Sequence, residues 1–403
     1  MSDYRLSTNC LHAGYVPGNG EPRNLPIVQS TTFRYATGEA MGALFDLEAE
    51  GYFYTRLQNP TSDAVAAKIC ALEGGFAAML TSSGQAANFF AVFNIAGCGD
   101  HVVCSSAIYG GTFNLFSVTM KRMGVDFTFV SPDCSDAELE AAFRPNTKAV
   151  FGEPLIVDNT FATPVNCRPF QWGADIVTHS TTKYMDGHAN AVGGAIVDAG
   201  KFDWTAHADK FPGLTTPDES YHGITYAEKF GLAGAYITKA TAQLMRDFGA
   251  SPAPMNAYLL NVGLETLPLR MARHCANALE AARYLEGHDK VAWVNYPGLA
   301  GSPCRALVEK YLPHGTCGVV SFGVKGGREA ASKFMAGLKL CSIATHVADA
   351  KTCVLHPAST THRQMNDAEL AAAGVSPDLI RLSVGIEDPA DLLADLEQAL
   401  AAL

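Results

Sequence analysis

The sequence predicts an α/β fold with a mostly parallel sheet, and three observations support it. After about residue 60, short apolar runs rich in β-branched and aromatic residues alternate with helical patterns. The runs are continuous and apolar, as in strands buried on both faces. Beyond about residue 250 longer helices predominate, with only a few strands between them. We therefore expect an N-terminal arm over 1–60, a large domain over 61–255 and a smaller α/β C-terminal domain over 256–403. The length agrees with this division, because roughly 150 residues per domain predicts two to three domains.

Local patterns place the individual elements. A helix is expected to begin at Pro60 and to end at Gly74, because apolar residues recur on one face from Val65 to Leu72. Buried strands are expected over 76–80, 101–104, 125–130, 148–151, 155–157, 176–177 and 195–197. The C-terminal part should hold helices near 256–286 and 328–338, strands over 319–324, 352–355 and 380–384, and a last helix with Pro389 near its start.

Charge and cysteine usage exclude several classes of protein. The chain has 29 Lys plus Arg against 40 Asp plus Glu, and its formal charge of −11 would repel a nucleic acid. No apolar run approaches the roughly 20 residues that cross a bilayer, and the first residues lack a signal-peptide pattern. The 11 cysteines contain no C-x-x-C pair and the 12 histidines no H-x-x-x-H pair. We expect a cytoplasmic protein without nucleic acid, membrane or metal partners.

Only three residues, 152–154, separate the predicted strands over 148–151 and 155–157. Parallel neighbours need a crossover of about a dozen residues, usually a helix. We therefore expect that a segment is missing between Glu153 and Pro154. The alternative is a tight antiparallel hairpin, which would aim Asp158 away from the sheet edge that the other motifs use.

A small turn that opens a helix could bind phosphate. Ser83, Gly84 and Gln85 follow one apolar run and begin a helical one, and free N–H groups at a helix N-terminus suit an anion. The alternative is an ordinary serine N-cap. Neither G-x-G-x-x-G nor G-x-x-x-x-G-K-[ST] occurs in the sequence.

Lys183 follows a predicted buried strand and two hydroxyl residues. A lysine that is partly desolvated at a sheet edge has a lowered pKa and can act as a nucleophile or base. The alternative is a surface lysine that extends from a loop into solvent. Ser180-x-x-Lys183 also matches the S-x-x-K of penicillin-binding acyl enzymes, but the S-D-N and K-T-G motifs of that class are absent.

Three further residues have both a functional and a structural interpretation. Asp158 ends an apolar strand, where a buried carboxylate could pair with a protonated pyridine nitrogen or cap a turn. Tyr109 follows another strand end, where its ring could stack on a cofactor or fill the core. Arg381 lies in an apolar strand, where it could bind a substrate carboxylate or an internal acid.

Taken together, these motifs resemble those of the Cys/Met-metabolism family of pyridoxal-phosphate enzymes, which have the type I, aspartate aminotransferase-like fold. The resemblance covers nearly the whole chain. The motifs that carry it are Leu11-His12-Ala13-Gly14, Tyr54-Thr55-Arg56-x-x-Asn59-Pro60-Thr61, Ser82-Ser83-Gly84-x-Ala86-Ala87, Tyr109-Gly110-Gly111-Thr112, Val157-Asp158-Asn159-Thr160-Phe161, His179-Ser180-x-Thr182-Lys183-Tyr184 and Arg381-Leu382-Ser383-Val384-Gly385.

The resemblance implies a role for each site residue. Lys183 would be the Schiff-base lysine and base, Asp158 the partner of the pyridine nitrogen, and Tyr109 the stacking ring and proton donor. Arg381 would bind the α-carboxylate of an amino-acid substrate. The phosphate would be held by Ser83, Gly84, Gln85, Ser180 and Thr182, together with Tyr54 and Arg56 of a neighbouring subunit. A homotetramer with shared active sites is therefore expected.

Further motifs are most similar to the O-acetylhomoserine sulfhydrylase branch of this family: 218–223, 264–267 and 356–362. That branch implies γ-replacement, in which O-acetyl-L-homoserine and sulfide or a small thiol give L-homocysteine or L-methionine plus acetate. His346 stands where many relatives have a serine, and is expected to contact the substrate. Methionine γ-lyase and cystathionine lyase or synthase chemistry remain alternatives, although Gly111 stands where methionine γ-lyases have a cysteine. A binding scaffold without activity is a further alternative, which Lys183, Asp158 and Arg381 argue against.

Overall fold

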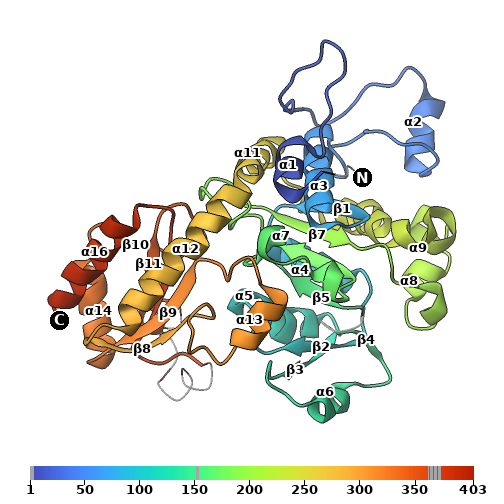
Figure 1. The fold of residues 1–403 in the computed structure, drawn as a ribbon. Helices are drawn as coiled ribbons and strands as arrows, with labels where there is room; N and C mark the ends of the chain where they lie inside the picture. The colour runs from blue at the N-terminus through green and yellow to red at the C-terminus, as the bar shows by residue number, and fades with distance from the viewer. Residues whose placement is uncertain (1–3, 151–153, 362, 364–365, 367–369, 371–373) are drawn as a thin grey trace. The chain divides into compact units, whose positions relative to one another are not determined.

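The computed structural model describes residues 4–150, 154–361, 363, 366, 370 and 374–403. The missing segment predicted between Glu153 and Pro154 falls on residues 151–153, outside the described residues, and stays a prediction. The chain forms two compact units (Figure 1). The first unit comprises Met1–Thr160, Arg168–Thr182 and Ala191–Val262, and the second comprises Phe161–Cys167, Lys183–Asn190 and Gly263–Leu403.

A four-stranded sheet in the first unit has the order β1-β7-β6-β5. Its strands are β1 (Ala77–Thr81), β7 (Gly194–Asp198), β6 (Ile176–His179) and β5 (Ile156–Asp158). β5 and β6 are parallel, with Asp158 opposite Thr178, so that both strands end at the same edge. β7 is antiparallel to both of its neighbours. The connection from β6 to β7 contains turns but no crossover helix among its residues, which is why the chain returns antiparallel.

A three-stranded parallel sheet in the same unit has the order β3-β2-β4. It consists of β3 (Asp126–Val130), β2 (His101–Ser105) and β4 (Thr147–Val150). Among the described residues β4 does not pair with β5, so the tight hairpin considered as an alternative is not formed there.

The helices of the first unit surround a core rich in aromatic side chains. α3 (Pro60–Glu73) begins and ends as predicted, with Asn59 as its N-cap and Gly74 in the left-handed conformation at its end. In the core, the Trp204 and Tyr236 rings stack at 5.6 Å. The other helical segments are α1 (Leu6–His12), α2 (Gly38–Phe45), α4 (Gly84–Phe93), α5 (Gly110–Asn114), η1 (Leu115–Met120), α6 (Asp136–Ala142), η2 (Pro169–Trp172), η3 (Thr205–His207), α8 (Pro212–Thr215), η4 (Glu219–Tyr221), α9 (Tyr226–Lys239), η5 (Ala240–Met245) and α10 (Arg246–Phe248).

The helix predicted over 256–286 is divided at Thr266 into α11 (Pro254–Glu265) and α12 (Leu267–Glu286). Thr266 has φ −105° and ψ 3°, and Pro268 follows in the first turn of α12. Proline has no N–H with which to continue a helix from the preceding turn, so the periodic apolar pattern conceals a break. Pattern alone does not locate such a break.

The second unit contains a five-stranded sheet of order β10-β11-β12-β9-β8. Its strands are β8 (Val291–Asn295), β9 (Val319–Val324), β10 (Ser342–Ile343), β11 (Cys353–Leu355) and β12 (Leu379–Ser383). α12, α14 (Gly327–Gly337) and α16 (Pro389–Ala401) contribute to one core with this sheet (Figure 1). The remaining short helices are α7 (Thr163–Asn166), α13 (Arg305–Tyr311) and η6 (Pro357–Ser359).

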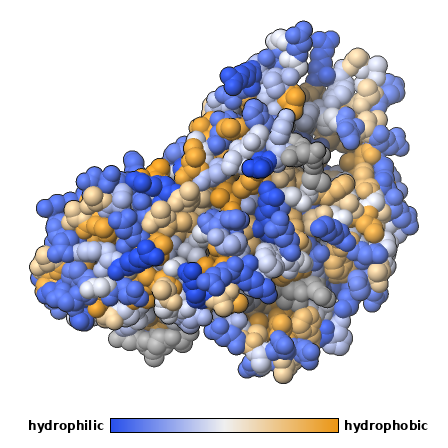
Figure 2. Space-filling view, viewed as in Figure 1, coloured by the Kyte–Doolittle hydropathy of each residue, from blue (hydrophilic) through white to orange (hydrophobic). Residues whose placement is uncertain are grey.

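The described residues include neither a helix that could span a membrane nor a cluster of metal ligands. None of the helices described is long and apolar enough to cross a bilayer, and polar and apolar side chains are interspersed over the face in Figure 2. No three His, Cys, Asp or Glu side chains in the described part of the chain gather as a metal would need.

Candidate functional site

The N-terminus of α4 abuts the segment that follows β6. Ser83 is the N-cap, and its side chain accepts a hydrogen bond from Ala86 N at 3.1 Å, as the alternative of an ordinary cap predicted. A Cβ on Gly84 would lie 2.5 Å from Ser180 Cβ. Only glycine therefore allows this close approach, which brings the free N–H groups at the start of α4 next to Ser180.

Asp158 is exposed, and the expectation that it is buried is wrong. Its Oδ1 accepts hydrogen bonds from Thr160 N at 3.1 Å and from the Thr160 hydroxyl. Thr160 Oγ1 also accepts a hydrogen bond from Ser180 N at 2.8 Å. Because β5 ends at Asp158, this carboxylate lies at the edge of the sheet and is exposed to solvent. Thr160 thus links the carboxylate to the segment that holds Ser180.

A buried asparagine that the sequence reasoning missed connects the residues of this edge. Asn88 Nδ2 lies 3.4 Å from Asp158 Oδ2 and donates to Thr112 Oγ1 at 3.1 Å, while Asn88 Oδ1 accepts a hydrogen bond from Thr178. Thr112 in turn donates to Gln85 Oε1 at 2.7 Å. The available signal was that Asn88 lies four residues after Gly84, and therefore on the same face of α4.

A second, buried network connects the ends of β5 and β6. Glu73 and His179 are both 1% exposed, and Glu73 Oε1 lies 2.6 Å from His179 Nε2. The same oxygen accepts a hydrogen bond from Asn159 Nδ2 at 2.8 Å. Asn159 directly follows the site residue Asp158, and His179 directly precedes the site residue Ser180. The carboxylate at the end of α3 therefore holds both strand ends in place.

Tyr109 is 70% exposed, so it does not fill the core. It directly precedes α5 as its N-cap. A Cβ on Gly111 would lie 2.5 Å from Tyr109 Cε1, whereas one on Gly110 would meet nothing within 4 Å. The tyrosine ring therefore lies over Gly111, with the rest of its surface open to solvent.

Thr182 links the two ends of the connection between β6 and β7 by hydrogen bonds to Gly193. Its hydroxyl accepts a hydrogen bond from Gly193 N at 3.0 Å and lies 3.2 Å from Gly193 O. Lys183 follows it in the chain and belongs to the second unit.

Within the second unit, Lys183 lies in the electrostatic field of Arg381. The lysine is half-buried. Burial lowers the pKa of Lys183, and the charge of Arg381 lowers it further. This agrees with the interpretation of a desolvated lysine, and it increases the fraction of free amine at neutral pH.

Arg381 and His346 are joined through the backbone. Arg381 Nη2 donates to the carbonyl oxygens of Thr345 and His346, both at 3.1 Å. Burial, followed by the charge of Lys183, lowers the pKa of His346. His346 Nε2 is buried without a hydrogen-bond partner among the described residues. The second unit thus places an amine, a guanidinium and a neutral imidazole near one another.

Tyr54 and Arg56 lie apart from the other site residues of the first unit. The Arg56 guanidinium lies 5.2 Å from the centre of the Tyr54 ring and donates to the carbonyl oxygen of Arg246. Both side chains line an open pocket of about 2200 Å³ in the first unit. The described lining of this pocket includes neither Ser83, Gly84, Gln85, Asp158, Ser180 nor Thr182.

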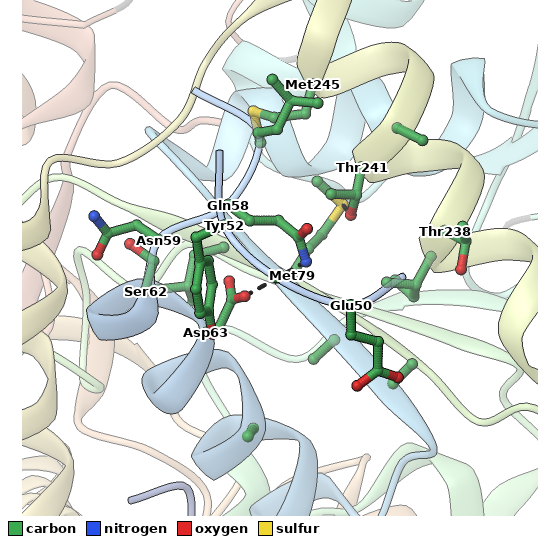
Figure 3. Close-up of a pocket in the computed structure, with 18 of the residues that line it drawn as sticks. Glu50, Tyr52, Gln58, Asn59, Ser62, Asp63, Met79, Thr238, Thr241 and Met245 are labelled. Atoms are coloured by element: carbon green, nitrogen blue, oxygen red, sulfur yellow. Dashed lines mark hydrogen bonds between the residues drawn. The ribbon is translucent and has the colours of Figure 1, made fainter. Parts of the chain in front are cut away.

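Figure 3 shows part of this pocket, where the arm faces α3 and the helix that carries Thr241 and Met245. Asp63 lies on its α3 side, 3.5 Å from Gln58 Nε2. Burial raises the pKa of Asp63 to about 7. The pocket therefore has a mixed lining, which includes the apolar side chains of Met79 and Met245 and the acids Glu50 and Asp63.

The donors and acceptors described fit pyridoxal phosphate. Its phosphate needs N–H and O–H donors, which the start of α4, Ser180 and Thr182 supply. Its protonated ring nitrogen needs a carboxylate, and Asp158 is exposed and held by Thr160. Its flat ring suits an exposed aromatic ring, and its carbonyl carbon reacts with an amine.

Comparison with known proteins agrees with this chemistry. The family model described as Cys/Met metabolism PLP-dependent enzyme matches residues 7–155 and 152–401. A homocysteine synthase of Schizosaccharomyces pombe is 44% identical over 97% of this chain and 96% of its own length. An O-acetyl-L-homoserine sulfhydrylase of Corynebacterium glutamicum is 43% identical over 99% of this chain and 97% of its own length.

A solved structure is also similar along nearly the whole chain. It is a Campylobacter jejuni protein assigned as an O-acetylhomoserine (thiol)-lyase, with N'-pyridoxyl-lysine-5'-monophosphate. It is 34% identical, covers 99% of this chain and 100% of its own, and superposes with a TM-score of 0.91. The type I α/β fold expected from the motifs is therefore confirmed, and the chain belongs to the Cys/Met metabolism family of pyridoxal-phosphate-dependent enzymes.

Proposed function

We propose that the chain catalyses γ-replacement on O-acetyl-L-homoserine. Sulfide replaces the acetyl ester oxygen at the γ-carbon, so that L-homocysteine and acetate form; a small thiol such as methanethiol would give L-methionine. The observation that carries the proposal is the set of relatives named homocysteine synthase and O-acetyl-L-homoserine sulfhydrylase, which match 97–99% of the chain at 43–44% identity.

The first unit would bind the cofactor. Ser83, Gly84, Gln85, Ser180 and Thr182 would hold its phosphate, and Asp158 would keep its ring nitrogen protonated. Tyr109 would stack on its ring. Pyridoxal phosphate, when bound, supplies an electron sink that stabilises negative charge at the substrate α-carbon.

The second unit would supply the base and the substrate contacts. The lowered pKa of Lys183 increases the fraction of free amine, and its Nζ would bind the cofactor and accept the α-proton. The Arg381 guanidinium would bind the α-carboxylate, and the imidazole of His346 would line the substrate side of that contact.

Gly111 favours replacement over lyase chemistry. Tyr109 lies over a residue without a side chain, so no thiol stands beneath the ring to accommodate a thioether substrate. Acetate leaves far more readily than a thiolate, and a phenol is a strong enough acid to assist its departure.

The proposed assembly is a homotetramer whose active sites are completed by a neighbouring subunit. Tyr54 and Arg56 line a pocket that includes none of the other cofactor residues proposed for the same unit, which supports their action on the site of a second copy. The proposed location is the cytoplasm. All 11 cysteines are free thiols, in keeping with a reducing compartment.

Product analysis tests the proposed reaction. Purified holoenzyme is given O-acetyl-L-homoserine with and without sulfide, and separately L-methionine, with Lys183→Ala as the blank. We expect homocysteine to form at least about tenfold faster than 2-oxobutanoate forms from L-methionine, a difference of about 1.4 kcal/mol in barrier. If 2-oxobutanoate and ammonia dominate without sulfide, the protein is a lyase and the proposal fails.

A further inference from the structure

A buried arginine holds the turn that begins with Lys183. Arg270, on α12, is 4% exposed. Its Nη1 donates to Tyr184 O at 2.6 Å, and its Nη2 lies 3.3 Å from Met185 O and 2.6 Å from Gly263 O. Its Nε donates to Thr266 Oγ1 at 3.1 Å. All of these atoms belong to the second unit.

The turn requires such a partner because of its backbone geometry. Lys183 O accepts a hydrogen bond from Gly187 N at 2.8 Å, as in one turn of helix. The chain then leaves the helical path, which deprives the carbonyls of Tyr184 and Met185 of the donors that a continuing helix would supply. The guanidinium of Arg270 supplies those donors from outside the turn.

Two glycines leave the space that this contact needs. A Cβ on Gly187 would lie 2.1 Å from Arg270 Nη1, and Gly187 has φ +73°. A Cβ on Gly263 would lie 2.6 Å from Met185 O. The turn, the guanidinium and the backbone at Gly263 are therefore in close contact.

Other contacts hold the same turn farther along. Tyr184 Oη accepts a hydrogen bond from Gly318 N at 2.8 Å, and Gly187 O accepts one from Ala350 N at 2.9 Å. Arg270, by contrast, binds the carbonyls one and two residues after Lys183. It therefore acts on the peptide groups that determine where the lysine side chain starts.

We propose that Arg270 is a positioning residue for Lys183, and that its planar fork of N–H donors holds the lysine-bearing turn in the geometry needed to capture the cofactor. Lysine cannot replace it, because all three N–H donors of an ammonium sit on one nitrogen, whereas the acceptors here are reached from three separate nitrogens of a planar fork. This inference rests on the proposal that Lys183 carries the cofactor.

The test measures cofactor capture and not turnover alone. Apoprotein is mixed with pyridoxal phosphate, the rise of the visible absorbance band is followed, and borohydride reduction with peptide mapping identifies the labelled lysine. In Arg270→Lys we expect capture to slow at least about tenfold, as small misplacements of reacting groups do, while the far-UV spectrum stays unchanged. Arg273→Lys is the matched control, because Arg273 lies on the same helix and is exposed.

Chemical rescue separates positioning from general stability. In Arg270→Ala, guanidinium at a few tens of millimolar should restore capture several-fold, whereas equal sodium chloride should not. Gly187→Ala should also capture slowly, because its Cβ displaces the guanidinium, but added guanidinium should not rescue it.

Each other outcome overturns the proposal. Wild-type capture by Arg270→Lys, or no rescue of Arg270→Ala, excludes a positioning role. An Arg270→Lys protein that does not fold would assign the residue to the fold alone. A label on another lysine of the wild type would instead refute the Lys183 assignment, and this inference with it.

Discussion

The Tyr109 ring lies over Gly111 so closely that a Cβ there would stand 2.5 Å from Tyr109 Cε1. Gly111 does not have a positive φ, so the glycine is not needed for a tight turn. It is needed because the ring occupies the space of a side chain. The identity of residue 111 therefore determines where the proposed stacking ring lies.

Gly111→Cys should displace the Tyr109 ring and impair replacement. We expect kcat/KM for O-acetyl-L-homoserine to fall at least about tenfold, or about 1.4 kcal/mol of transition-state stabilisation. The share of 2-oxobutanoate among the products should rise. The thermal midpoint should change little, because the ring is largely exposed. Gly110→Ala is the control, since its Cβ meets nothing within 4 Å. Equal effects of the two substitutions would refute the explanation.

Removing the charge of Arg381 should raise the pKa of Lys183. The cation disfavours protonation of the nearby amine, so Arg381→Gln stabilises the ammonium form. In the apoprotein, the pH midpoint for labelling Lys183 with an amine-specific reagent should move upward, and labelling at a fixed pH below that midpoint should slow. Peptide mapping measures the rate at this lysine, and the exposed Arg273→Gln serves as control. A midpoint that falls or stays would contradict the coupling.

Hybrid oligomers should recover activity that neither parent has. Arg56→Ala removes a residue proposed to act on a neighbour's phosphate, and Lys183→Ala removes the proposed base. A mixed oligomer would contain one site with both intact residues. We expect activity to appear after subunit exchange, which tagged subunits can verify. If exchange is verified and the mixture stays inactive, the shared site is wrong.

Glu73→Ala should destabilise the protein strongly. It removes the Glu73 oxygen that joins the buried side chains of His179 and Asn159, and loss of a buried hydrogen-bond partner costs about 1–3 kcal/mol. Denaturant unfolding measures the change. Glu140→Ala, at an exposed position of α6, should leave the midpoint unchanged. A similar midpoint for both variants would show that the buried network does not hold the strand ends.

The sequence was sufficient for the elements with strong local signals. α3 and α16 begin at prolines and carry apolar stripes, and both were predicted close to their observed bounds. The division of 256–286 at Thr266 was not predicted, because apolar periodicity continues across it. The direction of β7 was also not evident, because strand direction depends on the connection and not on the strand's own residues.

The site residues had signals of unequal strength. Ser83, Lys183 and Arg381 were marked by their positions next to strands or helix starts. Asn88 was missed because a polar residue inside a helix has no special pattern in one sequence. Its role is apparent only when Asp158, Thr112 and Thr178 are brought around it. The exposure of Asp158 depends on where β5 ends, which the apolar run alone did not determine.

The chain crosses between its two units at Thr160, Cys167, Thr182, Asn190 and Val262, and this connectivity affects the order of events during synthesis on the ribosome. The turn that starts at Lys183 is held by Arg270, Gly318 and Ala350, all of which emerge later than the lysine itself. A nascent chain that ends before them has the lysine but lacks the backbone partners of its turn. Cofactor loading is therefore expected only after synthesis has passed Ala350, and a product truncated near residue 262 would lack those partners permanently.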